Sequence, residues 1–141
     1  MGRCCMMRLA RFSPDDPREW LNRARSSLIR ASSCRALAGV YFEDVCFDAQ
    51  QAAEKAIKAV LLSRRVEFPW THDLGALLDL ARQAGVAIPM DVAECVTLTL
   101  YATAGRYPRS VEPVSDDECG SAIRQAEAVV RWAEATVKVA P

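Results

Sequence analysis

One stretch in the first half of the chain decides the fold: VCFDAQQAAEKAIKA, residues 45–59. Its apolar side chains recur at spacings of three and four residues, which places them in a single stripe along an α-helix. With its flanks, the stretch predicts a helix over 42–64. Many of the stripe residues are alanines, and small side chains allow a neighbouring helix to approach closely. The stretch therefore indicates an amphipathic helix in close contact with others.

The polar residues of the same stretch are predicted to form the other face of this helix. Gln51, Lys55 and Lys58 lie opposite the apolar stripe, and Gln50 and Glu54 lie on its border. Glu54 and Lys58 are four residues apart, a spacing that stabilises a helix surface by roughly 0.2–0.5 kcal/mol. We therefore expect a solvent-facing ion pair at these two positions.

Similar signals mark helices on both sides of this stretch. Asp16-Pro17 opens one helix and Gly39 ends it, Thr71 caps another that ends at Gly85, and a capping box begins at Ser115. No segment shows the alternation of a strand. The fold class predicted is all-α, a single bundle of about five helices, with the domain over 15–138 and a flexible tail over 1–14. Besides 42–64, the predicted helices are 17–38, 72–84, 91–104 and 116–138.

The helix predicted over 91–104 has the least regular pattern of the five. At α-helical spacing, its inward positions are Val92, Cys95, Val96 and Leu100.

Composition excludes several classes of protein. The chain has 141 residues, 51% of them hydrophobic, which is too apolar for a disordered protein. Its 18 basic and 18 acidic residues cancel, so it is not a strongly basic nucleic-acid binder in bulk charge. No run of apolar residues reaches the length of a membrane-spanning helix. We therefore expect a globular protein without a membrane segment.

The cysteines predict no metal site. No two of them have CxxC spacing, and His72 is the single histidine, so we expect no metal and no cofactor. Cys34, Cys46 and Cys95 fall within helical patterns, where cysteine behaves as a small hydrophobic residue. We interpret these as reduced core thiols of a cytoplasmic protein.

Two places carry residues suited to binding an anion or a base. His72 and Asp73 stand at a predicted helix start, where they either open the helix or face a phosphate. Arg106, Tyr107 and Arg109 follow a helix end. There, arginine either caps the helix carbonyls, with the tyrosine packed in the bundle, or clamps a phosphate while the tyrosine stacks on a base.

A third place is the basic residues on or just after the 42–64 helix. Lys55, Lys58, Arg64 and Arg65 form either a solvated face or a modest strip for RNA phosphates.

The 45–59 stretch resembles the second-helix signature of HEPN domains (higher eukaryotes and prokaryotes nucleotide-binding). Three further elements occur in the order found in that family: Arg18-Glu19-Trp20-Leu21, Thr71-His72-Asp73-Leu74 and Arg106-Tyr107-Pro108. The resemblance implies an HEPN-like helical bundle and a homodimer. It also implies pairing with a minimal nucleotidyltransferase, often as a toxin–antitoxin module, and in some members adenylylation of a tyrosine.

Many HEPN toxins are metal-independent ribonucleases with an Arg-x(4–6)-His motif. Here Arg65 and His72 have that spacing but span the loop at Pro69, and no histidine follows Arg106. Asp48 stands where many relatives have histidine in the second-helix block. Whether the chain is an enzyme is left open, with Arg65 and His72 as the catalytic candidates.

The resemblance leads to one functional prediction and two alternatives. We predict a nucleotide- or RNA-binding protein that acts with a separately encoded nucleotidyltransferase. The alternatives are an active HEPN ribonuclease toxin and a non-catalytic helical interaction module. The predicted nucleotide or RNA contacts are Arg106, Tyr107, Arg109, His72, Gln51 and Lys55.

Overall fold

The computed structural model describes residues 9–104 and 113–139, and every regular element in those ranges is helical. The predicted all-α bundle of about five helices is confirmed, because the three short elements α4, η1 and α5 follow one another as one continuous helical stretch. The elements are α1 (Pro17–Cys34), α2 (Phe42–Ser63), α3 (Leu74–Gln83), α4 (Met90–Ala93), the 3-10 helix η1 (Glu94–Leu100), α5 (Tyr101–Ala104) and α6 (Asp116–Val139).

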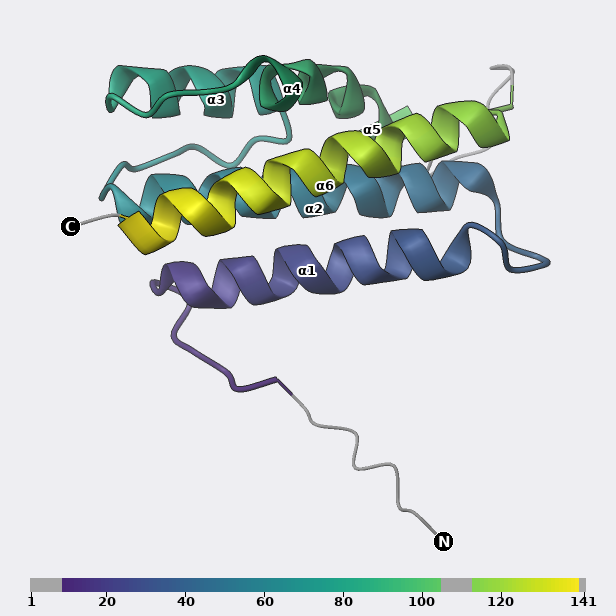
Figure 1. Cartoon of the computed structure of the whole chain (residues 1–141), viewed down its shortest axis with the longest axis horizontal. Coiled ribbons are helices and arrows are strands. Elements are labelled where there is room, and N and C mark those ends of the chain that lie inside the picture. The colour runs from purple at the N-terminus through teal and green to yellow at the C-terminus, as the bar shows by residue number, and fades with distance from the viewer. Residues whose placement is uncertain (1–8, 105–112, 140–141) are drawn as a thin grey trace, which may run out of the picture.

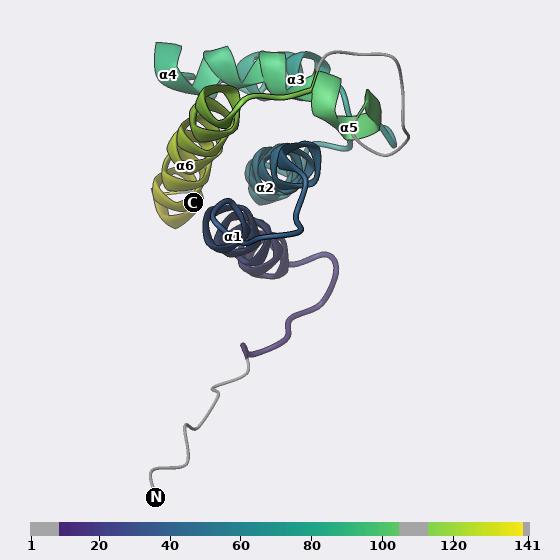
Figure 2. The same cartoon turned by 90° about the vertical axis from the view of Figure 1, so that its right-hand side faces the viewer.

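The helices form a layered bundle around α2. Figure 1 shows α1 on one side of α2 and α6, running opposite to both, and α3 with α4 on the other side. Figure 2 shows the same order end-on, with the α4–η1–α5 stretch lying across α6 and α2. The stretch that decides the fold is therefore the central helix of the molecule.

The core of the bundle is formed mainly by the small side chains of α2. Its five alanines between 49 and 59 are completely buried, as are Ile57 and Leu61. Contacts from α1 and α6 cover this helix on two sides, which requires small residues where helix axes come close. The apolar stripe predicted for α2 is confirmed.

Helix α1 begins where the sequence indicates and ends early. Asp16 is the N-cap, its carboxylate accepting from the Arg18 backbone N–H at 2.9 Å, and Pro17 follows at the first helical position. The helix ends at Cys34 rather than near residue 38, and the side chain of Arg35, which follows it, pairs with Asp116 of α6 at 2.9 Å. Gly39, with φ +83°, lies in the connecting loop rather than at the helix end.

The helix predicted over 91–104 is interrupted by the 3-10 helix η1. Its β-branched residues resist regular α-helix, and the Thr97 hydroxyl donates to the Glu94 carbonyl oxygen at 3.1 Å. A 3-10 helix has three residues per turn, so Val92, Cys95 and Leu98 face inward. The prediction that Val96 and Leu100 face inward is wrong, and both are exposed.

The described cysteines are free thiols. Cys46, Cys95 and Cys119 are completely buried, and Cys34 is partly buried. Burial raises the pKa of the Cys46 and Cys95 thiols to about 12. These thiols are core side chains, as the sequence predicts for Cys46 and Cys95.

The described ranges contain neither a cluster of metal ligands nor a helix suited to spanning a membrane. Within the described ranges, no group of three His, Cys, Asp or Glu side chains gathers to hold a metal ion. None of the helices in those ranges is long and apolar enough to cross a membrane.

Candidate functional site

Glu54 on α2 is the centre of a polar cluster inside the bundle. The residue is 4% exposed, and its carboxylate has partners on both oxygens. Lys58 Nζ lies 2.8 Å from Oε1, and His72 Nδ1 lies 2.8 Å from Oε2. Gln50 Nε2 donates to Oε2 at 2.9 Å, and Gln51 Nε2 donates to the same oxygen at 3.4 Å. A buried carboxylate with this many partners is stable as an anion.

The ionisation of Glu54 follows from two opposing effects. Burial by itself raises the pKa of a carboxyl group, because the charged form loses its water. Hydrogen bonds from Lys58, Gln50 and His72 outweigh this effect, so that the pKa of Glu54 lies below its ordinary value. The cluster therefore contains a carboxylate and an ammonium group in direct contact.

His72 connects this buried cluster to the surface. Its side chain is 59% exposed although Nδ1 contacts the buried Glu54 carboxylate. In the neutral imidazole, Nδ1 then carries the hydrogen and Nε2 keeps its lone pair. No polar side chain or backbone group within 9–104 and 113–139 forms a hydrogen bond with Nε2. The Glu54 carboxylate therefore orients the imidazole through Nδ1, and Nε2 is left free to contact a ligand.

Three aromatic rings surround the Lys58 ammonium. Its Nζ lies 5.6 Å from the Phe68 ring centroid and 5.9 Å from those of Trp20 and Trp70. Trp20 and Phe68 contact each other edge to face at 6.0 Å. Because Lys58 is 3% exposed, the Glu54 ion pair and the contacts with the partly buried rings of Trp20 and Phe68 together replace its hydration.

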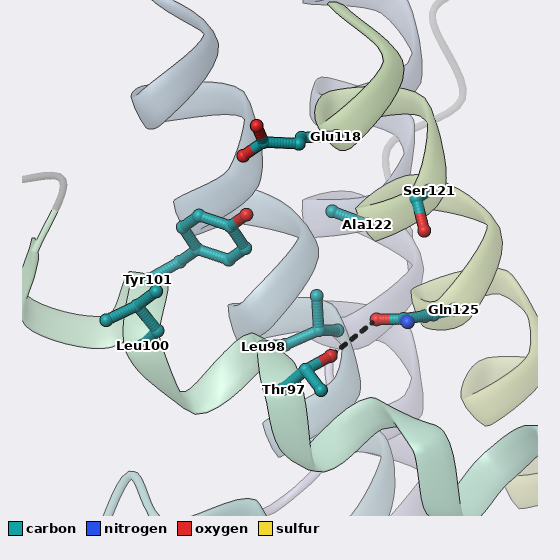
Figure 3. Close-up of a pocket in the computed structure, with 8 residues that line it drawn as sticks. All are labelled: Thr97, Leu98, Leu100, Tyr101, Glu118, Ser121, Ala122 and Gln125. Atoms are coloured by element: carbon teal, nitrogen blue, oxygen red, sulfur yellow. Dashed lines mark hydrogen bonds between the residues drawn. The ribbon is translucent and has the colours of Figure 1, made fainter. Parts of the chain in front are cut away.

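A second polar region lies between the η1–α5 stretch and α6. It is an open cleft of about 230 Å³, and Figure 3 shows side chains from the two sides facing each other across it. Thr97 Oγ1 and Gln125 Oε1 are 3.2 Å apart at one end. Burial raises the pKa of Tyr101 to about 12, so that its hydroxyl is neutral and can donate a hydrogen bond. The lining residues are Thr97, Leu98, Leu100, Tyr101, Glu118, Ser121, Ala122 and Gln125.

This cleft continues along α6. Ser121 and Gln125 also line a neighbouring cleft of about 290 Å³, with Asp91 and Glu94 on one wall and Arg124 and Arg131 on α6. The two clefts together form a polar groove between α6 and the α4–η1–α5 stretch. At one end the groove reaches Leu100 and Tyr101, where η1 meets α5.

The sequence of the whole domain has a clear family signature. A model of the HEPN domain family matches residues 17–136. The chain belongs to the HEPN domain family. Among solved structures, the HEPN chain is similar to ST0689, an archaeal HEPN homologue, at 26% identity and a TM-score of 0.70. That match covers 86% of this chain and 98% of the archaeal one, and a search of curated proteins found no match.

In this HEPN domain, the structure brings two of the predicted contact residues together. Gln51 and His72 meet at the Glu54 carboxylate, one from α2 and the other from the loop before α3. Lys55 lies on another side of α2, where its Nζ donates to the Ser27 hydroxyl of α1 at 3.0 Å. Burial lowers the pKa of Lys55. Lys55 is therefore directed toward α1 rather than toward His72.

Arg65, the other catalytic candidate, is not joined to His72. It follows α2 with a left-handed φ of 57°, and its side chain is exposed. No hydrogen bond or ion pair between Arg65 and His72 occurs in the described part of the chain. Arg106, Tyr107 and Arg109 lie outside the described residues.

Two expectations about this HEPN site are corrected by the structure. Glu54 and Lys58 form a buried ion pair and not the surface pair predicted from their spacing. Helix α3 begins at Leu74, with Asp73 as the N-cap in place of Thr71. The Thr71 hydroxyl instead accepts from the Asp73 backbone N–H at 3.1 Å. His72 therefore belongs to the loop and not to the helix.

Sequence reasoning missed the aromatic residues of the site. The signal was present in the short segment Phe68-Pro69-Trp70-Thr71-His72, which places two aromatic rings next to the single histidine. Nothing in the segment itself indicates that Lys58 of α2 lies close to its rings. That contact depends on how the loop folds back over α2.

Proposed function

We propose that this HEPN protein binds a nucleotide or an RNA and acts with a separately encoded nucleotidyltransferase in a toxin–antitoxin module. Membership of the family supports the nucleotide- or RNA-related role. The observation that carries the proposal is the cleft between α6 and the η1–α5 stretch, whose lining residue Tyr101 lies five residues before Arg106 in the chain. The proposed contacts are Arg106, Tyr107 and Arg109 beyond α5, together with His72, Gln51 and Lys55 near α2.

The character of the cleft supports a small polar ligand. Thr97, Ser121 and Gln125 offer neutral hydrogen-bonding groups, and the Tyr101 ring and Leu98 supply an apolar side. Sites for small molecules combine an apolar lining with a few polar groups in this way, although their volumes usually lie between about 300 and 1,000 Å³. A cleft of about 230 Å³ suits one nucleobase or nucleoside rather than a dinucleotide.

Arg106 is the residue that tests this proposal. Its guanidinium is always charged and its planar fork matches phosphate oxygens. Replacing Arg106 by Ala should weaken the binding of fluorescently labelled ATP, or of a labelled RNA hexamer of adenines, by about 1.5–3 kcal/mol. Arg82→Ala is the matched control, since Arg82 is an exposed arginine on α3 that pairs with Asp79 of the same helix.

Fluorescence anisotropy measures both variants, and thermal unfolding monitors the fold. The proposal requires that Arg106→Ala lose affinity while Arg82→Ala keeps it, with both unfolding near the wild-type temperature. If Arg106→Ala unfolds the protein and has no separate effect on binding, Arg106 is a helix cap and the assignment is wrong.

A ribonuclease is the second candidate, because His72 has the form of a general base. Its Nδ1 is held by a buried carboxylate and its Nε2 is open to solvent. The separation of Arg65 from His72 counts against a shared reaction centre. If the chain cuts RNA, His72→Ala and Arg65→Ala should abolish cleavage equally. A chain that neither binds nor cuts would instead be a plain interaction module.

The proposed function also implies an oligomeric state and a cellular location. We infer a homodimer located in the cytoplasm, with no cofactor or metal required. The free thiols among the described cysteines support a reducing compartment.

A further inference from the structure

Trp70 is an exposed aromatic side chain with no cover from the bundle. Its exposed fraction is 98%, the highest among the large apolar residues that the structure describes. A tryptophan offers roughly 150–250 Å² of surface for burial, and an uncovered indole is an unused contact area. Its position needs an explanation beyond packing.

The Trp70 ring lies near the buried Lys58 ammonium. Lys58 Nζ lies 5.9 Å from its centroid, and that ammonium is in turn held 2.8 Å from Glu54 Oε1. Pro69 precedes the ring and fixes one backbone angle of the loop. Trp70 is therefore almost completely exposed although its ring lies near a buried cation.

Most exposed side chains of the segment that carries Trp70 are polar, and the neighbouring rings of Trp20 and Phe68 are partly buried. In the segment 64–73 the other exposed side chains are Arg65, Glu67, Pro69, His72 and Asp73, and the remaining apolar ones, Val66 and Phe68, are partly buried. Hot spots for a protein partner lie within a wider apolar patch. A single ring with a polar rim instead matches the platforms on which unpaired bases stack.

The geometry points to Trp70 as a stacking platform for one unpaired base of a single-stranded RNA, with Nε2 of His72, two residues further along the same loop, as a hydrogen-bond acceptor for that base. This inference rests on the proposed RNA-binding function and names a further contact surface for it. The proposed function already includes phosphate contacts at Arg106. Trp70, in the loop before α3, would add a contact with a base.

The orientation of His72 adds a preference among bases. Because Glu54 holds the Nδ1 hydrogen, neutral Nε2 can accept a hydrogen bond. Adenine, cytosine and guanine carry an exocyclic amine that donates one. A hexamer of adenines should therefore bind more tightly through this surface than a hexamer of uracils.

The contribution of Trp70 should not depend on salt. Charged residues of the segment cancel, with Arg64 and Arg65 against Glu67 and Asp73. Stacking on a ring neutralises no phosphate, so it should leave the slope of log affinity against log salt unchanged. Removal of a phosphate contact, as expected for Arg106→Ala, should make that slope shallower.

The test uses the full chain and fluorescein-labelled RNA hexamers, measured by anisotropy across a salt series. Trp70→Ala should weaken the adenine hexamer roughly 5- to 150-fold, the range for one stacked base, with an unchanged salt slope. Trp70→Phe should retain most of the affinity because a ring remains. An abasic hexamer of equal charge should bind wild type and Trp70→Ala alike. Both variants should unfold like wild type, since the side chain is exposed.

The outcomes separate this inference from the proposed function. If Arg106→Ala weakens the adenine hexamer and Trp70→Ala does not, the stacking surface is refuted and the proposed function stands. If Trp70→Ala alone weakens it, the stacking surface stands and the role of Arg106 is refuted. If Trp70→Ala changes the molar mass in light scattering and leaves RNA affinity intact, the ring contacts protein, and the inference is overturned.

Discussion

Glu54 and Lys58 carry opposite charges in a place where neither is stable alone. Each is almost completely removed from water, and each has the other at 2.8 Å. The spacing of four residues occurs both on helix surfaces and in interiors, so the sequence could predict the pair but not its burial. The difference comes from the partly buried rings of Trp20 and Phe68, which lie far apart in the sequence and meet beside Lys58.

A double-mutant cycle at this pair should show strong coupling. Glu54→Gln or Lys58→Met alone leaves a buried charge without its partner, which should lower the free energy of unfolding by about 3–5 kcal/mol. The double variant should lose much less, because no charge remains and the thioether introduced by Lys58→Met can contact the aromatic rings. Urea denaturation measures all four proteins. Additive losses would show that the two side chains act independently.

The pH dependence of stability should also trace to Glu54. Its pKa in the folded protein is lowered, so the unfolded chain takes up this proton first as the pH falls. The stability that the carboxylate contributes is present above the ordinary carboxyl pKa and is lost in acid, below about pH 5.

Glu54→Gln should therefore give a shallower fall in unfolding free energy between about pH 5 and pH 3 than wild type. Glu67→Gln, an exposed change of the same charge, is the control and should follow wild type. Equal slopes for Glu54→Gln and wild type would contradict this account.

At the scale of elements, end signals and apolar spacing predicted most helices well. Asp16-Pro17 opens α1, and α6 runs over Asp116–Val139 where 116–138 was predicted. The failures have tertiary or local causes. Helix α1 ends at Cys34, where Arg35 pairs with Asp116 of α6, and the β-branched residues of η1 change the helix period from 3.6 to 3. An α-helical pattern search cannot detect either event.

Asp73 links the candidate site to α3 as its N-cap. Its Oδ1 accepts from the Ala76 backbone N–H at 3.2 Å. Asp73→Ala should lower the free energy of unfolding by about 0.5–2 kcal/mol, while Asp73→Ser should keep most of it, since serine is also a good N-cap. Chemical denaturation followed by circular dichroism distinguishes the two. An alanine variant as stable as the serine variant would show that the cap contributes nothing.

At the scale of the whole molecule, the exposed apolar side chains indicate where a second copy of the chain could bind. The alanine-rich pattern of α2 predicts a close contact with other helices, and α1 and α6 provide that contact within one chain. Exposed apolar side chains include Val96 and Leu100 on η1, and Leu100 also lines the cleft of Figure 3. The homodimer stays a prediction, with η1 as the face to examine.

Light scattering at micromolar concentration should give about 31 kDa, twice the chain mass of 15.5 kDa. Leu100→Lys should shift the mass toward one chain by placing a charge in an apolar contact. Ile29→Lys, an equally exposed change on α1, should not. A wild-type protein with the mass of one chain would contradict the dimer.

The reactivity of three buried thiols can report how often different parts of the bundle open. Cys46 on α2, Cys95 on η1 and Cys119 on α6 have no exposed surface, so a thiol reagent can reach each sulfur only after that part of the bundle opens. Labelling rates under native conditions therefore time the opening of three elements separately. If η1 opens more often than the long helices, Cys95 will be modified first, and the short helical stretch beside the cleft will be identified as the part of the bundle that moves.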